Sequence, residues 1–163
     1  PTHSPTSVLY FFCQAAVGDG NKPVLRFGPT SGPTDVLQTT DLLIGKKLVD
    51  QPLVFANACT TSSADPYVAN LLQQNLFRRG CRGFLGTETK VPIQLASRFA
   101  EIFFHFFYRK ADQAPMAAGE ALAQTRLFLL TEYANIGGIF YTYLNQYELY
   151  MASDSEVQAL RPR

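Results

Sequence analysis

The side chains of this chain with the widest chemical range are three thiols and two imidazoles: Cys13, Cys59, Cys81, His3 and His105. A thiolate can attack a carbonyl carbon or bind a metal ion. No Cys-x-x-Cys spacing occurs, and both His residues are far from any Cys in the sequence, so no metal site is expected. The odd number of Cys residues, with no disulfide-framework spacing, predicts reduced thiols and a cytoplasmic setting.

Three short apolar runs, at 8–12, 53–58 and 82–87, predict the strands that would position these thiols. Each run lacks polar alternation, which is typical of strands buried on both faces of a parallel sheet. Functional residues of such sheets gather at the carboxyl ends of the strands. If the three strands are neighbours, one crevice receives their ends, which read Cys13-Gln14-Ala15, Asn57-Ala58-Cys59-Thr60 and Gly86-Thr87-Glu88.

The remaining elements predict an α/β order. A loop-like stretch covers 13–35, within which 24–27 could form a short strand. Capping residues and apolar spacing predict helices, and an aromatic segment predicts an edge strand or hairpin. These helices are expected over 39–47, 66–79, 92–109 and 115–132, and the edge segment over 139–152. The fold class predicted is α/β, a mostly parallel sheet flanked by helices.

Two segments resemble the CHAT domain, a caspase-like cysteine-peptidase family named for its association with TPR repeats. YFFCQA is similar to the family's strand that ends in Cys-His-Gly or Cys-His-Ala. LVFANAC, the helix after it and the strand ending in GTE resemble the second signature, in which a strand ends in Asn-Ala-Cys. AGEALAQTR is similar to a later family helix, with Thr125 where Ala is usual. The resemblance covers residues 7 to 151, and the stretch from NAC to GTE is its specific part.

The resemblance implies a Cys/His dyad that attacks a peptide bond. Cys59 then holds the nucleophile position, and Gln14 stands in the position of the His general base. The backbone N–H groups of Ala15 and Cys59 would form the oxyanion hole. Glu88 would lie at the mouth of the crevice and contact substrate, or would cap the next helix. Asn57 is expected to bond to backbone near the end of its strand.

With Gln14 in the position of the base, three hypotheses about function are open. An amide cannot accept a proton near neutral pH, so the first is an impaired peptidase module with a docking or regulatory role. The second is an active cysteine endopeptidase that uses Cys59 with a base from elsewhere. Within the chain, His3 lies near the terminus and His105 lies among Phe residues of a helix, so neither is expected to replace the base. The third, a flavodoxin-like small-molecule domain, has only the strand order in its favour.

The resemblance also predicts how much of a domain is present. Residues 1–152 are expected to form a partial caspase-like domain that lacks its N-terminal strand-helix-strand unit, and 153–163 a polar tail. The expected partner is a protein or peptide: the missing N-terminal half, TPR-type repeats or a second copy. The predicted helix 92–109 is apolar nearly all round, so we expect one of its sides to meet a missing segment or a partner chain.

Composition excludes several other classes. The chain has 163 residues, is 47% hydrophobic and 17% charged, and fits one folded domain. Its 14 basic and 13 acidic residues give a net charge of +1, too little to predict binding to nucleic acid. No apolar run reaches the roughly 18 residues that suggest a membrane span. No cofactor is expected.

Overall fold

In the computed structural model, residues 8–18, 23–28, 35–38, 41, 47–48, 50–60, 66–87, 89–108, 114, 116–146 and 148–151 are described. Within them, one sheet has the strand order β3-β2-β1-β4-β5-β6. The strands are β1 (Val8–Val17), β2 (Pro23–Phe27), β3 (Asp35–Gln38), β4 (Leu53–Thr60), β5 (Gly83–Thr87) and β6 (Tyr141–Asn145). The helices are α2 (Pro66–Arg78), α3 (Ile93–Phe107), α4 (Ala118–Tyr133) and the short 3-10 helix η2 (Ile136–Phe140).

The sheet has a parallel centre and antiparallel edges. β1, β4 and β5 are parallel neighbours. On one side β2 and β3 form an antiparallel extension of β1, and on the other side β6 runs antiparallel to β5. The predicted α/β class is therefore confirmed, and the arrangement is consistent with a caspase-like fold. The parallel pairing is confined to the three central strands.

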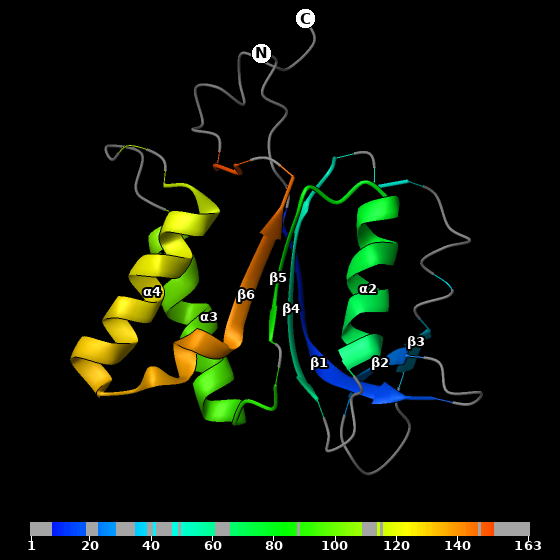
Figure 1. Cartoon of the computed structure of the whole chain (residues 1–163), viewed down its shortest axis with the longest axis horizontal. Helices are drawn as coiled ribbons and strands as arrows, with labels where there is room; N and C mark the ends of the chain where they lie inside the picture. The colour runs from blue at the N-terminus through cyan, green and yellow to red at the C-terminus, as the bar shows by residue number, and fades with distance from the viewer. Residues whose placement is uncertain are drawn as a thin grey trace, which may run out of the picture.

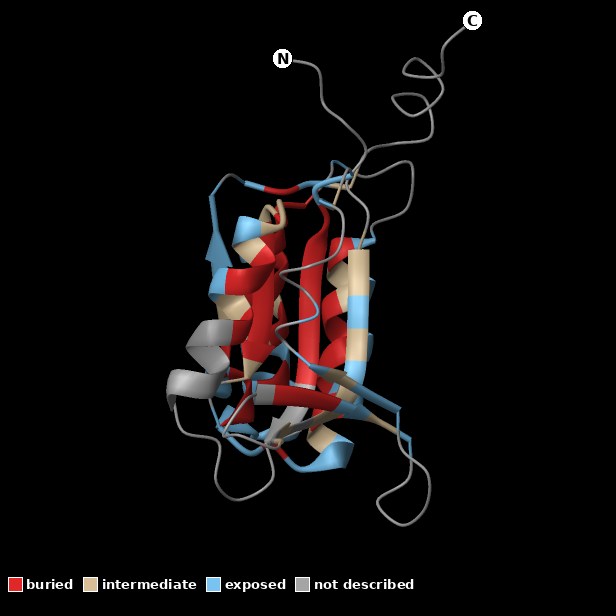
Figure 2. Cartoon of the chain, turned by 90° about the vertical axis from the view of Figure 1, so that its right-hand side faces the viewer, coloured by how far each residue is buried: buried red, intermediate tan, exposed pale blue. Residues whose placement is uncertain are grey.

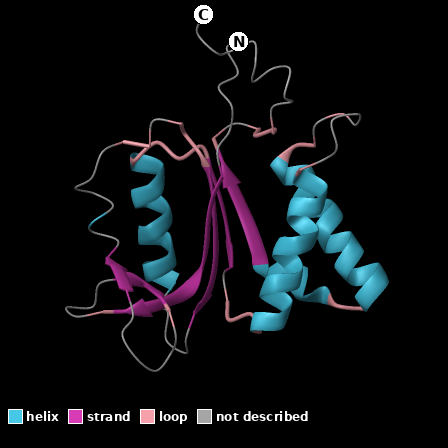
Figure 3. Ribbon diagram, turned by 180° about the vertical axis from the view of Figure 1, so that it is seen from behind, coloured by secondary structure: helices cyan, strands magenta, loops and turns pink. Residues whose placement is uncertain are grey.

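Helices cover both faces of the sheet (Figures 1 and 3). α2 packs on one face, where Val54, Ala56 and Phe84 contact Leu72 and Leu76 in one buried cluster. α3 and α4 lie on the opposite face. β4 and β5 are buried along most of their length, and burial on both faces is the reason that they are almost wholly apolar (Figure 2). The residues of β1 whose burial is described are half-buried or exposed, among them Tyr10 and Phe12, so the predicted burial of 8–12 on both faces is wrong.

The opposite face of the sheet carries an aromatic cluster centred on Phe55, which is fully buried. Its ring lies 5.0 Å from the ring of Tyr10 and 5.4 Å from that of Phe103. Phe99 stacks on Tyr141 of β6. α3 lies between the sheet and α4, which together cover much of its apolar surface, while Ile93 and Tyr108 at its two ends are exposed.

Three elements differ from the sequence-based expectation. β1 continues to Val17, because its last residues have partner strands. Gln14 and Ala15 pair with both β2 and β4, and Ala16 and Val17 pair with β2 alone. β4 continues through Cys59 to Thr60, where a loop was expected. β3 was not predicted, since its four residues are largely exposed and show no apolar alternation. The predicted helix over 39–47 lies mostly outside the described residues, and the tail 153–163 lies wholly outside them.

The described helices include none that combines the length and the apolar character needed to cross a membrane.

Candidate functional site

The pairing of β1 with β4 brings the two predicted site residues to the same level of the sheet. Gln14 is the register partner of Cys59, and Ala15 is the partner of Thr60. Neighbouring strands lie about 4.8 Å apart, so Gln14 and Cys59 are adjacent along the sheet although 45 positions separate them in the numbering. The predicted adjacency of the three strands is confirmed by the order β1-β4-β5. Glu88 lies outside the described residues.

The antiparallel pairing of β1 with β2 adds a third residue to this row. Gln14 is the register partner of Arg26, so Arg26, Gln14 and Cys59 follow one another across β2, β1 and β4. The sequence-based reasoning missed Arg26. The only signal for it was the short apolar run at 24–27, and the register that places Arg26 opposite Gln14 is set by a hairpin whose pairing the sequence does not specify.

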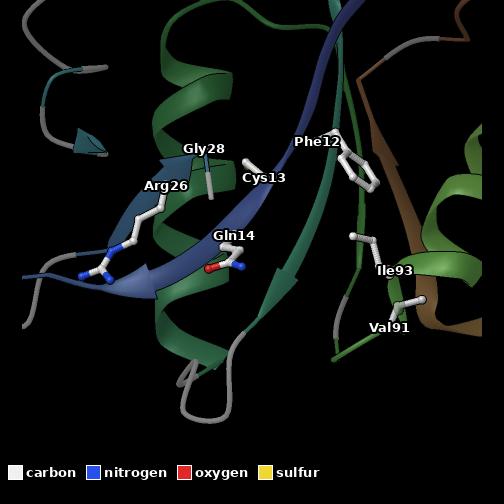
Figure 4. A pocket seen from close by; sticks show the side chains of 7 residues that line it. All are labelled: Phe12, Cys13, Gln14, Arg26, Gly28, Val91 and Ile93. Atoms are coloured by element: carbon white, nitrogen blue, oxygen red, sulfur yellow. The ribbon is translucent and has the colours of Figure 1, made fainter. Parts of the chain in front are cut away.

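A hollow of about 270 Å³ opens at Gln14. Arg26 and Gly28 line it from β2 and the residue after it, and Phe12 lines it from β1. Val91 and Ile93, at the start of α3, complete its apolar side. In Figure 4, Arg26 and Gln14 lie toward one end of the hollow, and Phe12, Val91 and Ile93 toward the other. Among the described residues that line it, Arg26 alone is charged, which gives this lining a positive character.

Asn57, on β4 shortly before Cys59, is buried and fixes this part of the strand. Its Nδ2 donates to the carbonyl oxygen of Ala96 at 2.7 Å and to the hydroxyl of Tyr10 at 3.1 Å. Its Oδ1 accepts from the hydroxyl of Tyr141 at 2.9 Å. A carbonyl oxygen only accepts, so the bond to Ala96 fixes the orientation of the amide. Asn57 thus ties β4 to β1, α3 and β6, and the expected bond to backbone is present.

We expect Asn57→Ala to lower the free energy of unfolding by about 2–3 kcal/mol, because it leaves the buried hydroxyl of Tyr141 and the carbonyl of Ala96 without this partner. Chemical denaturation monitored by circular dichroism measures the loss. Asn135→Ala is the matched control. Asn135 is exposed and accepts one bond, from the N–H of Gly137, so its loss should cost about 1 kcal/mol or less. Equal losses in the two variants would contradict a special role for the Asn57 network.

The other candidate groups are not members of the row. Cys13, which precedes Gln14 on β1, is half-buried, also lines the hollow (Figure 4) and packs against the cluster on the α2 side of the sheet. Cys81 is 1% exposed, and burial raises the pKa of its thiol to about 12. His105 is exposed on α3, about 18 Å along the helix axis from Ile93 at the hollow. Both Cys residues therefore contribute to packing, and His105 is too distant from Gln14 to replace it as a base.

The chemistry that the described lining supports is binding rather than proton transfer. Gln14 can donate and accept hydrogen bonds but cannot take a proton at neutral pH, and the guanidinium of Arg26 only donates. The hollow therefore offers donors and a positive charge. Among the described residues, no group of three or more His, Cys, Asp or Glu side chains is arranged to hold a metal ion.

Comparison with known proteins gives one informative similarity. The chain is 29% identical over 153 residues to a probable protease of Vitiosangium sp. (strain GDMCC 1.1324). The match covers 91% of this chain but 19% of the relative, so the chain spans about a fifth of the length of the curated relative it matches. No family model matches the chain.

Proposed function

We propose that this chain is a CHAT-like, caspase-type cysteine-peptidase module in which Cys59 holds the nucleophile position and Gln14 replaces the general base. Without a base, the thiol is mostly protonated at neutral pH and peptide cleavage is strongly impaired. The module then acts by docking or regulation, on a protein or peptide partner. The backbone N–H groups of Ala15 and Cys59 are the proposed oxyanion-hole donors.

The observation that carries this proposal is the pairing of Gln14 with Cys59 across β1 and β4. A dyad needs its two members within hydrogen-bond reach, and adjacent strands provide a spacing of about 4.8 Å. The similarity to a probable protease supports a peptidase ancestry for this pair. The described lining residues include no imidazole and no carboxylate that could serve as the base, which supports impairment.

A second candidate is an active cysteine endopeptidase whose base comes from another part of a longer protein or from a partner. It is favoured by the match to a probable protease, of which this chain spans only a fifth. Both candidates predict an unreactive Cys59 in the isolated chain, which has no external base. They make opposite predictions for Cys59 in the longer protein, or in the presence of the partner that supplies the base.

The test is labelling of the chain with a thiol-reactive probe at neutral pH, followed by peptide mapping, together with a panel of peptide substrates. We expect slow labelling of Cys59, at the rate of an ordinary thiol, and no turnover. Cys81 should remain unlabelled in the folded chain, since burial raises its pKa to about 12, and it serves as an internal check of folding. Rapid, selective labelling of Cys59 in the chain alone, with turnover that Cys59→Ala abolishes, would overturn impairment. The same result obtained only with the longer protein or an added partner would favour the second candidate.

A further inference from the structure

We propose that the hollow at Gln14 and Arg26 is a carboxylate-binding site, which takes an acidic side chain or the C-terminal carboxylate of a peptide. The replacement of a base by Gln14 would then have changed the role of this position from moving a proton to holding a ligand. That the ligand is a peptide rests on the proposed function, whereas its negative charge is inferred from the hollow itself.

The positive charge of Arg26 in the hollow favours a ligand with a negative charge. Arg26 is exposed, and among the described residues it has no carboxylate partner, since the salt bridge found there joins Arg98 to Glu101. A guanidinium presents several N–H donors in a planar fork that matches the two oxygens of a carboxylate. No other charge lines the hollow, so nothing in the described lining opposes an anion or attracts a cation.

Gln14 adds a second donor on the adjacent strand. Its register partnership with Arg26 brings the two residues to one level of β1 and β2, and both side chains line the hollow (Figure 4). The amide NH₂ of Gln14 can donate to one carboxylate oxygen while Arg26 binds the other. A His in this position would instead carry a proton that titrates near neutral pH, which suits catalysis better than constant ligand binding.

The size and the apolar side of the hollow limit what enters. Its volume of about 270 Å³ lies below the roughly 300–1,000 Å³ of pockets that enclose a whole small molecule. It therefore suits one side chain or one chain end of a longer ligand. Ile93 is 57% exposed and Phe12 is 43% exposed, so the methylene groups of a ligand would cover apolar surface that now faces solvent.

The experiment measures binding of fluorescently labelled peptides by anisotropy at low salt, with the full chain carrying Cys59→Ala so that no peptide is consumed. The peptides share one Gly/Ser/Ala scaffold and carry a central Glu, Gln or Lys. A second set repeats the Glu and Gln peptides with the C-terminus free or amidated. Arg26→Gln and Gln14→Leu remove the two donors. Arg78→Gln, which removes an exposed charge from α2 on the other face of the sheet, is the matched control.

We expect a peptide with a carboxylate to bind about tenfold more tightly than its amide counterpart, since one charge-assisted pair contributes about that factor. Arg26→Gln should abolish this preference, Gln14→Leu should reduce it, and Arg78→Gln should leave it unchanged. Preference for Glu in amidated peptides assigns the site to side chains, and preference for free termini assigns it to chain ends. Equal binding of acid and amide peptides, a preference that survives Arg26→Gln, or no saturable binding would overturn the proposal. None of these results depends on the reactivity of Cys59, so the proposed function is tested separately.

Discussion

Replacing Gln14 with His is expected to make Cys59 react about sixfold faster with a disulfide probe near pH 6.5. A Cys thiol ordinarily has a pKa of about 8.5, and a neighbouring imidazolium lowers it to about 6.5. The thiolate fraction near pH 6.5 then rises about fiftyfold, from about 1% to about 50%. The thiolate of a more acidic thiol is less nucleophilic, which lowers the rate about eightfold and leaves a net gain of about sixfold. The midpoint of the pH profile should move down by about two units. Stopped-flow measurement of probe release at several pH values records both changes.

Two variants control this experiment. Gln74→His introduces the same imidazole on the exposed face of α2 and should leave the reactivity of Cys59 unchanged. The double change Gln14→His with Cys59→Ala should remove the fast phase, which assigns it to Cys59. An unchanged pH profile in Gln14→His would mean that the register pairing does not bring the two side chains into reach, and the assignment of Gln14 to the base position would be wrong.

Truncation of Phe55 to Ala is expected to lower the free energy of unfolding by about 3–5 kcal/mol, the usual cost of removing a fully buried aromatic side chain. Phe55 is 0% exposed and lies at the centre of the aromatic cluster on the α3 side. Five rings lie within 6.2 Å of its own, centroid to centroid, namely those of Tyr10, Phe99, Phe103, Phe104 and Tyr141. The resulting cavity would lie beneath β4.

Phe128→Ala is the control for Phe55→Ala. Phe128 lies on α4, is 37% exposed and contacts fewer rings, so its truncation should cost about 1 kcal/mol or less. Urea denaturation of the two variants and the parent chain measures the difference. Similar losses in the free energy of unfolding at both positions would contradict the central role of Phe55 in the core.

The sequence predicted the parallel centre of the sheet well, for a physical reason. Strands covered on both faces must be apolar throughout, so 53–58 and 82–87 stand out from their polar surroundings. β3 could not be found in this way, because Asp35–Gln38 is largely exposed and is held in the sheet by pairing with β2. The end of β1 was placed too early, since Gln14 and its neighbours are kept extended by two partner strands and not by their own propensity.

For the candidate site, the adjacency of Gln14 and Cys59 followed from two parallel strands of known direction, and the register agrees with it. Arg26 could not be predicted, because a shift of one position between β1 and β2 would place a different residue opposite Gln14. The network of Asn57 was predicted only as a bond to backbone. Its two Tyr partners come from distant parts of the chain, which are brought together by packing of β6 and β1.

The β2–β3 hairpin lies outside the parallel centre of the sheet, and it contacts β1 mainly along Gln14–Val17. Changes in the length or composition of this hairpin would exchange Arg26 for another residue while β1 and β4 keep their register. In the proposed site, the charge that selects a ligand comes from the hairpin, the residues that set the reactivity of the thiol come from β1 and β4, and Gln14 contributes to both. Homologous chains could diversify their partners through the hairpin alone, with the β1–β4 pair held constant by the buried aromatic cluster beneath it.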